Sequence, residues 1–185
     1  MTEYKRDVQK NKLYKVERIW GSNHNSPKNV SFKDLKEASN HATWIWINFK
    51  KKIYGRYSYG YKKNTPTVKC FKIRGGTSLA HNGFYPTNTN RFKYYKKISL
   101  SRYHYSFDVI IHEMAHHLAP RREMHGPIFT KIYMYLLAYY LDYDLEYMCK
   151  IANEHNLQFA SDDLYLNTMF NKLFLKQQQK RKEVA

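Results

Sequence analysis

The segment from residue 106 to residue 129 constrains this chain more than any other, because it spaces histidines and a glutamate as a metal site requires. Apolar residues recur at helical spacing over residues 107–118. Ser106 stands where an N-cap is expected, Asp108 complements the positive end of the helix dipole, and Pro120 prevents much continuation. The pattern therefore predicts a short helix that carries the site.

His112 and His116 lie four residues apart, so a helix places them one turn above each other on one face. Both rings can then direct a nitrogen at one metal ion about 2 Å away. Glu113 follows the first histidine and flanks the ion, where a carboxylate can act as a general base. Two histidines do not complete a catalytic zinc site, which normally takes three protein ligands.

His125 is the predicted third ligand. It follows a polar loop and precedes Gly126 and Pro127, which indicate a turn and then the first turn of a new helix. A helix N-terminus favours the neutral imidazole, which is the form that binds metals. Asp142 or Glu146 from a later helix remains an alternative third ligand.

The remaining histidines are expected to have other roles. His117 points about 100° away from His116 on a helix, so it is expected to pack, to support the ligands or to lie at the surface. His81 and His104 are interpreted as ordinary polar residues. The whole motif also has an alternative interpretation, as a polar helix face whose histidines are buried and hydrogen-bonded.

With this pair of motifs the chain resembles the SprT-like (Spartan-type) zinc metallopeptidases, in which a His-Glu-x-x-His helix is followed by a His-Gly-Pro-x-Phe segment. It is also similar to a set of uncharacterised metallohydrolases with the same two motifs. The resemblance spans roughly residues 31–159 and is sharp over residues 98–129. It implies a zincin-like fold and cleavage of proteins that are bound or crosslinked to DNA.

The resemblance also assigns roles to individual residues. It implies one Zn²⁺ ion, Glu113 as the catalytic base or acid, and three metal ligands: His112, His116 and His125. A further group must stabilise the negative charge that develops on the substrate oxygen. The candidates by position are Tyr103, Arg121, Arg122 and Tyr133.

Two known patterns are missing. SprT-like proteins often carry a C-terminal zinc ribbon of cysteines, but the only cysteines here are Cys70 and Cys149. Both are expected as free, buried thiols in a reducing cytoplasm. The metzincin pattern is excluded because it requires glycine in place of Ala119 and histidine in place of Arg122.

The other patterns predict an α+β domain with a long N-terminal helix, a small and mostly antiparallel sheet, the site helix and a helical C-terminal part. Residues 13–20 alternate enough for a first strand, with a short helix as the alternative. A capping box at residues 31–34 starts a long amphipathic helix to residue 51. Strands are predicted at residues 68–73 and 78–85, joined by a two-glycine turn, and at residues 91–99. Apolar residues recur at helical spacing after residue 127, which predicts further helices, and residues 161–163 are expected to cap a last helix.

The length of 185 residues indicates one domain. We expect an N-terminal basic segment at 1–30, the SprT-like domain at 31–159 and a helical extension with a basic tail at 160–185. No stretch approaches the roughly 20 apolar residues of a membrane span, and the N-terminus lacks the apolar core of a signal peptide. A cytoplasmic protein, in association with DNA or the nucleoid, is therefore predicted.

The positive charge is concentrated before the site helix. Residues 1–105 hold 23 basic and 5 acidic side chains, a net charge of +18. Such asymmetry predicts a polyanionic partner, most simply nucleic acid, with DNA favoured over RNA by the resemblance. Tyrosines among basic residues can stack bases or hold a phosphate backbone, although an ordinary tyrosine-rich edge strand is an equal alternative. The predicted contacts are Lys50, Lys51, Lys52, Arg56, Tyr57, Tyr59, Tyr61, Lys62 and Lys63.

Together these patterns favour a zinc-dependent hydrolase, most simply a peptidase, that acts on a protein or peptide at or near nucleic acid. The alternative is a nucleic-acid-binding protein whose zinc is structural or whose catalysis is lost. The +18 region supports the alternative, whereas Glu113 is a residue that a closed structural zinc site does not need.

Overall fold

The computed structural model describes residues 7–23, 28–54, 68–72, 78–86, 92–100, 106–119 and 123–161. These residues form five helices and one sheet, which confirms the predicted α+β class. The elements in chain order are α1 (Lys10–Ser22), α2 (Leu35–Tyr54), β1 (Val68–Lys72), β2 (Leu79–Pro86), β3 (Phe92–Leu100), α3 (Phe107–Leu118), α4 (Pro127–Leu141) and α5 (Leu145–Glu154).

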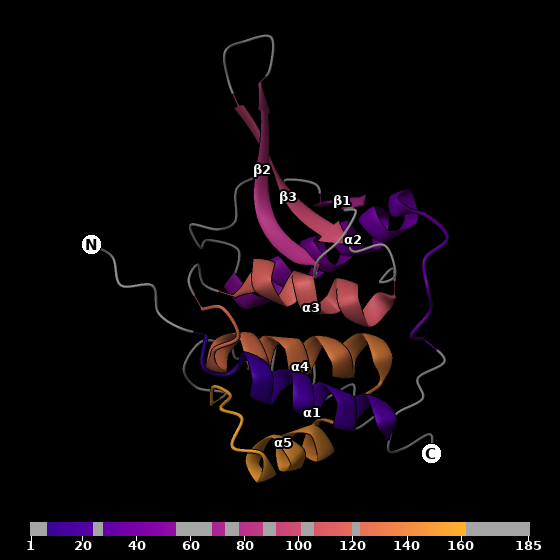
Figure 1. The fold of residues 1–185 in the computed structure, drawn as a ribbon. Coiled ribbons are helices and arrows are strands. Elements are labelled where there is room, and N and C mark those ends of the chain that lie inside the picture. The colour runs from indigo at the N-terminus through magenta and orange to yellow at the C-terminus, as the bar shows by residue number, and fades with distance from the viewer. Residues whose placement is uncertain are drawn as a thin grey trace, which may run out of the picture.

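The site helix α3 lies in the middle of the molecule. Figure 1 shows the sheet above α3, with α4, α1 and α5 below it. Helix α2 packs against β1 and α3, and α4 packs against α3 from the other side. This enclosure matches the composition of α3, whose Ile110, Ile111 and Met114 are fully buried. No helix among the described residues is long and apolar enough to cross a membrane.

Helix α1 corrects the expectation of a first strand and confirms the alternative of a short helix. Leu13, Val16 and Trp20 are buried at spacings of three and four residues, which is the period of a helix. A strand would place Leu13 and Val16 on opposite faces. Tertiary packing selects the helix over the strand, because α1 lies against α5 and buries these three side chains in the common core.

Helix α2 confirms the predicted long helix, but its cap lies three residues later than expected. Asp34 Oδ1 accepts the Glu37 N–H at 2.8 Å, and Glu37 Oε2 accepts the Lys33 N–H at 2.8 Å. The first bond satisfies an amide group that the first helical turn leaves free, and the second ties Glu37 to the residue before the cap. Phe32, just before the cap, is buried against Phe107 of α3 and so ties the start of α2 to the site helix.

The sheet is mixed, so the expectation of a mostly antiparallel sheet was wrong. Its order is β1-β3-β2, with β1 parallel and β2 antiparallel to β3. β1 and β2 are therefore not paired as the predicted two-glycine turn suggested, and that turn lies outside the described residues.

Helix α2 accounts for the position of β1. Ser39 Oγ accepts the Cys70 N–H at 2.9 Å, and Thr43 Oγ1 accepts the Val68 N–H at 3.0 Å. These hydroxyl groups accept hydrogen bonds from backbone N–H groups on the edge of β1 that does not face β3. Such edge groups would otherwise have no partner within the sheet. Cys70 and Cys149 are free thiols, as predicted, although Cys149 is only partly buried. The last predicted helix falls almost wholly on residues outside the described part of the chain.

Replacement of Leu13 by alanine tests the packing of α1. Because Leu13 is fully buried, Leu13→Ala is expected to lower the free energy of unfolding by about 2 to 5 kcal/mol, as measured by urea denaturation. Val8→Ala is the matched control, since Val8 is 76% exposed, and a change within about 0.5 kcal/mol is expected. Equal effects of the two substitutions would contradict the buried position of α1.

Candidate metal centre

Helix α3 spans the residues that the sequence predicted, but its N-terminus is capped differently. The Ser106 side chain makes no capping hydrogen bond. Instead, the Phe107 N–H donates to the Val30 carbonyl at 3.1 Å, and the Asp108 N–H donates to Asn29 Oδ1 at 3.2 Å. The segment before α2 therefore satisfies the first amide groups of α3 and fixes where the site helix begins.

The structure brings together the three predicted ligands, His112, His116 and His125. One nitrogen from each ring lies within 4.8 Å of the other two. His112 Nε2 and His125 Nε2 are 3.2 Å apart. Two nitrogen ligands about 2.05 Å from one tetrahedral ion are separated by about 3.3 Å, so these rings fit a shared metal ion. Within the described part of the chain, no fourth histidine, cysteine or carboxylate joins the group.

The loop before α4 positions His125 by backbone contacts. Glu123 accepts hydrogen bonds from Gly126 N–H through its carbonyl and from Ile128 N–H through Oε1, both at 2.9 Å. A Cβ on Gly126 would lie 2.9 Å from the Glu123 backbone carbonyl oxygen and 2.4 Å from Glu123 Oε1, so this tight turn needs glycine for space. Pro127 then begins α4 as predicted.

Carboxylates that the sequence did not reveal hold two of the rings. His112 Nδ1 lies 2.8 Å from Glu17 Oε1, and His125 Nδ1 lies 2.5 Å from Asp7 Oδ2. The sequence offered little signal, because these partners are 95 and 118 residues apart along the chain. A helical interpretation of residues 10–22 would have placed Tyr14 and Glu17 on one face.

The electrostatics favour neutral imidazole at His116. Burial lowers its pKa to about 2, and the nearby charges of His112 and His125 act in the same direction. Its ring also hydrogen bonds the Met124 backbone, which opposes the shift. For His125, burial lowers the pKa more than Asp7 raises it. For His112, burial lowers the pKa, but the hydrogen bond and charge of Glu17 and the charges of Glu113 and Asp108 together raise it by more, so the pKa is raised.

Glu113 is buried beside the ligands, with 4% of its surface exposed. Burial raises the pKa of its carboxyl to about 7, although the charge of His112 and a hydrogen bond from the Ala80 backbone of β2 oppose the rise. A carboxyl group in this range can exchange a proton near neutral pH.

A cavity of about 470 Å³ opens on Glu113 and His112. Tyr14 and Glu17 of α1 and Tyr133 of α4 form part of its wall. Among the candidates for charge stabilisation, Tyr133 reaches the cavity, where burial and then the charge of Glu17 raise its pKa. Tyr14, which the sequence analysis did not single out, lines the cavity, and its ring centre is 5.6 Å from that of His125. The other three candidates, Tyr103, Arg121 and Arg122, lie outside the described residues.

The alternative ligands lie elsewhere. His117 Nε2 bonds the Lys97 carbonyl of β3 at 3.1 Å, so it supports packing, as expected. Asp142 pairs with Lys28, and Glu146 is exposed on α5. The His81 side chain and all of His104 lie outside the described residues.

The predicted nucleic-acid contacts are not described. Lys50, Lys51 and Lys52 belong to the last turns of α2, but their side chains are outside the described part of the structure. Arg56, Tyr57, Tyr59, Tyr61, Lys62 and Lys63 lie wholly outside it. These contacts stay predictions.

No family model, curated protein or solved structure matches the chain.

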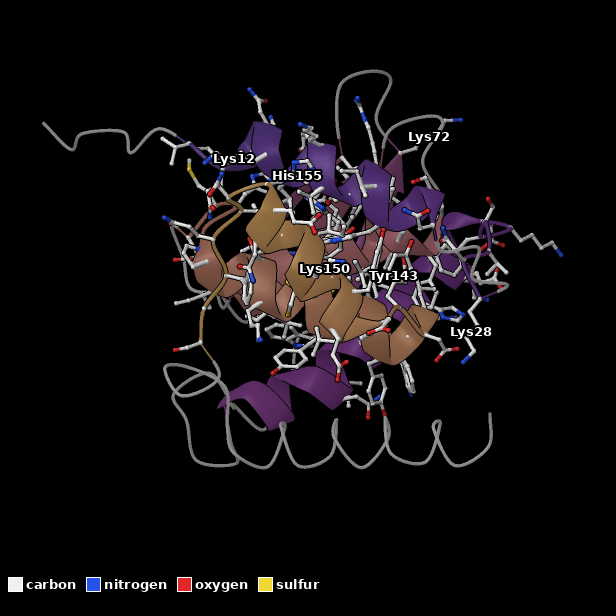
Figure 2. The ribbon with its side chains drawn as sticks, turned by 90° about the horizontal axis from the view of Figure 1, so that it is seen from below. Lys12, Lys28, Lys72, Tyr143, Lys150 and His155 are labelled. Carbon is white, nitrogen blue, oxygen red and sulfur yellow. The ribbon has the colours of Figure 1, made fainter. Side chains whose placement is uncertain are left out.

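Removal of one imidazole tests the centre. The purified protein is expected to bind one divalent metal ion per chain, and His125→Ala should abolish stoichiometric binding because two imidazoles remain. Elemental analysis after dialysis against trace zinc measures the ratio. His155→Ala, at the end of α5 (Figure 2), is the control and should keep the metal. Full zinc retention in His125→Ala would remove this residue from the ligand set.

Proposed function

We propose that this protein is a zinc-dependent metallohydrolase, most simply a peptidase that acts on proteins at or near nucleic acid. One observation carries the proposal: three imidazole nitrogens converge within 4.8 Å beside a buried glutamate that lines a cavity. A carboxyl group next to the ligands can take a proton from a water molecule at a catalytic zinc site. A structural zinc site is closed by four protein ligands, so it binds no water and needs no such carboxyl group.

The ligand set suits zinc. Imidazole binds zinc well, and three histidines form the protein side of a known class of catalytic zinc sites. Zinc held by His112, His116 and His125 would supply a Lewis acid and lower the pKa of a water molecule toward about 7.

Glu113 is the proposed proton carrier. Its carboxylate takes a proton from the attacking water and then returns the proton to the leaving amine. Burial raises the pKa of Glu113 to about 7, so the carboxyl group can both accept and release a proton near neutral pH. The Ala80 N–H bond holds the carboxylate against β2, so its position is fixed from the sheet side.

Tyr14 is the proposed donor to the developing oxyanion. Its pKa is raised by burial and then by the charges of Glu17, Glu113 and Asp7, so its hydroxyl stays protonated near neutral pH and can donate. We prefer it to Tyr133 in this role, because the Glu17 carboxylate near Tyr133 competes with a substrate oxygen for the Tyr133 hydroxyl.

Charge supports a nucleic-acid setting. As part of the +18 charge of residues 1–105, α1 exposes Lys10, Lys12, Lys15 and Arg18, and Arg18 lines the cavity at the metal centre. Lys12 lies near the end of α5 (Figure 2), where its Nζ donates to the Asn156 carbonyl at 3.2 Å. A polyanion bound here would place an attached protein near the cavity.

Two substitutions separate chemistry from metal binding. Glu113→Gln should keep the zinc but lower the hydrolysis of an unfolded protein substrate by about 10² to 10⁴-fold, since the proton carrier is lost. His116→Ala should lose both zinc and activity. Glu154→Gln, an exposed change at the end of α5, is the matched control. Undiminished hydrolysis by Glu113→Gln would refute the assigned role.

Binding to duplex DNA should depend steeply on salt. For about four neutralised phosphates, affinity is expected to fall by about a hundredfold between about 50 and 200 mM salt because counterions are released on binding. Fluorescence anisotropy with a labelled duplex measures this slope, and the hydrolysis assay is repeated with and without the duplex. Salt-independent binding would rule out phosphate contacts as the source of affinity.

A further inference from the structure

We propose that the N-terminal segment from Asp7 to Glu17 is a clamp for the metal centre, in which Asp7 and Glu17 are positioning residues that orient His125 and His112. The proposal rests on the metal site of the proposed function. It adds two residues that contact the ligand rings and not the metal ion, and they precede these ligands by about a hundred positions in the chain.

The first contact orients His125. Its Nδ1 lies 2.5 Å from Asp7 Oδ2, and the two side chains are 9% and 20% exposed. A neutral imidazole that donates its Nδ1–H to a carboxylate carries its lone pair on Nε2. That Nε2 is the atom that faces His112 at 3.2 Å. Asp7 thus selects both the tautomer and the direction of the ring.

The second contact orients His112 in the same way. Glu17 Oε1 lies 2.8 Å from His112 Nδ1, and Tyr133 lines the same cavity wall, where burial and then the charge of Glu17 raise the Tyr133 pKa. Tyr133 is buried in α4, so Glu17 of α1 is held between α3 and α4. Glu17 therefore lies between Tyr133 and His112, where it can accept hydrogen bonds from both.

Gln9 fixes the start of the clamp to the loop that carries His125. Its Nε2 donates to the His125 carbonyl at 3.2 Å, and its Oε1 accepts the Gln158 N–H at 2.7 Å. The Gln9 side chain is buried, which makes these bonds costly to break. The His125 backbone and ring are thus held by two residues of one short segment.

The arrangement has a thermodynamic consequence. Carboxylates on the far side of ligating imidazoles fix their orientation and raise their basicity, and their loss typically weakens metal binding by about 10 to 100-fold. Because both carboxylates come from one segment, the metal centre is complete only when α1 is docked. Metal binding and α1 docking should therefore stabilise each other.

The test uses near-isosteric changes and measures metal affinity alone. Asp7→Asn and Glu17→Gln should each weaken zinc binding by about 10 to 100-fold in competition with a chromophoric chelator. The visible absorption of the cobalt-substituted protein should also change, because ring orientation alters the ligand field. Glu154→Gln, which removes a distant exposed charge, should match wild type in both measurements.

A double-mutant cycle separates positioning from general stability. Tyr133→Phe should weaken zinc binding when Glu17 is present, and it should add no further loss to Glu17→Gln, because Tyr133 acts through that carboxylate. Zinc affinities of Asp7→Asn and Glu17→Gln within twofold of wild type would overturn the proposal. So would fully additive losses in the cycle.

The clamp and the proposed function can fail separately. A wild-type protein that binds zinc through the clamp but cleaves no protein substrate would refute the hydrolase and leave the clamp standing. Full cleavage activity with unchanged zinc affinity in both carboxylate variants would refute the clamp and leave the hydrolase standing.

Discussion

The structure depends on two imidazole nitrogens that face each other across 3.2 Å. His112 and His125 both direct Nδ1 at a carboxylate, so when the rings are neutral their Nε2 lone pairs point inward together with the ring of His116. Such lone pairs repel one another unless a cation or a shared proton lies between them. A metal ion resolves this repulsion best, because it accepts all three nitrogens at once.

Much of the core serves to hold these rings in place. Phe129, fully buried in α4, lies under all three imidazoles, with ring centres 4.2 to 5.2 Å away. Helix α3 is fixed at its start by the segment before α2, and the loop to His125 is closed around Gly126. The layers that enclose α3 in Figure 1 thus fix three side chains, two from α3 and one from the loop before α4.

The local part of this site could be predicted from the sequence, and the long-range part could not. Helical spacing determines that His112 and His116 share a face, and the Gly126–Pro127 pair indicates the turn that returns the chain. Asp7 and Glu17 reach the centre only through the docking of α1, which no local pattern records. The first strand was predicted wrongly for the same reason, because α1 forms by packing against distant residues. The sheet order is also long-range, since α2 determines the place of β1 through Ser39 and Thr43.

Zinc K-edge X-ray absorption of the metal-loaded protein tests the central claim most directly. Three imidazole nitrogens and one light oxygen ligand at about 2.0 to 2.1 Å are expected, with the multiple-scattering pattern of histidine. A sulfur ligand at about 2.3 Å would contradict a centre built from these histidines, because only a cysteine could supply it. A spectrum that requires fewer than three imidazoles would contradict it as well.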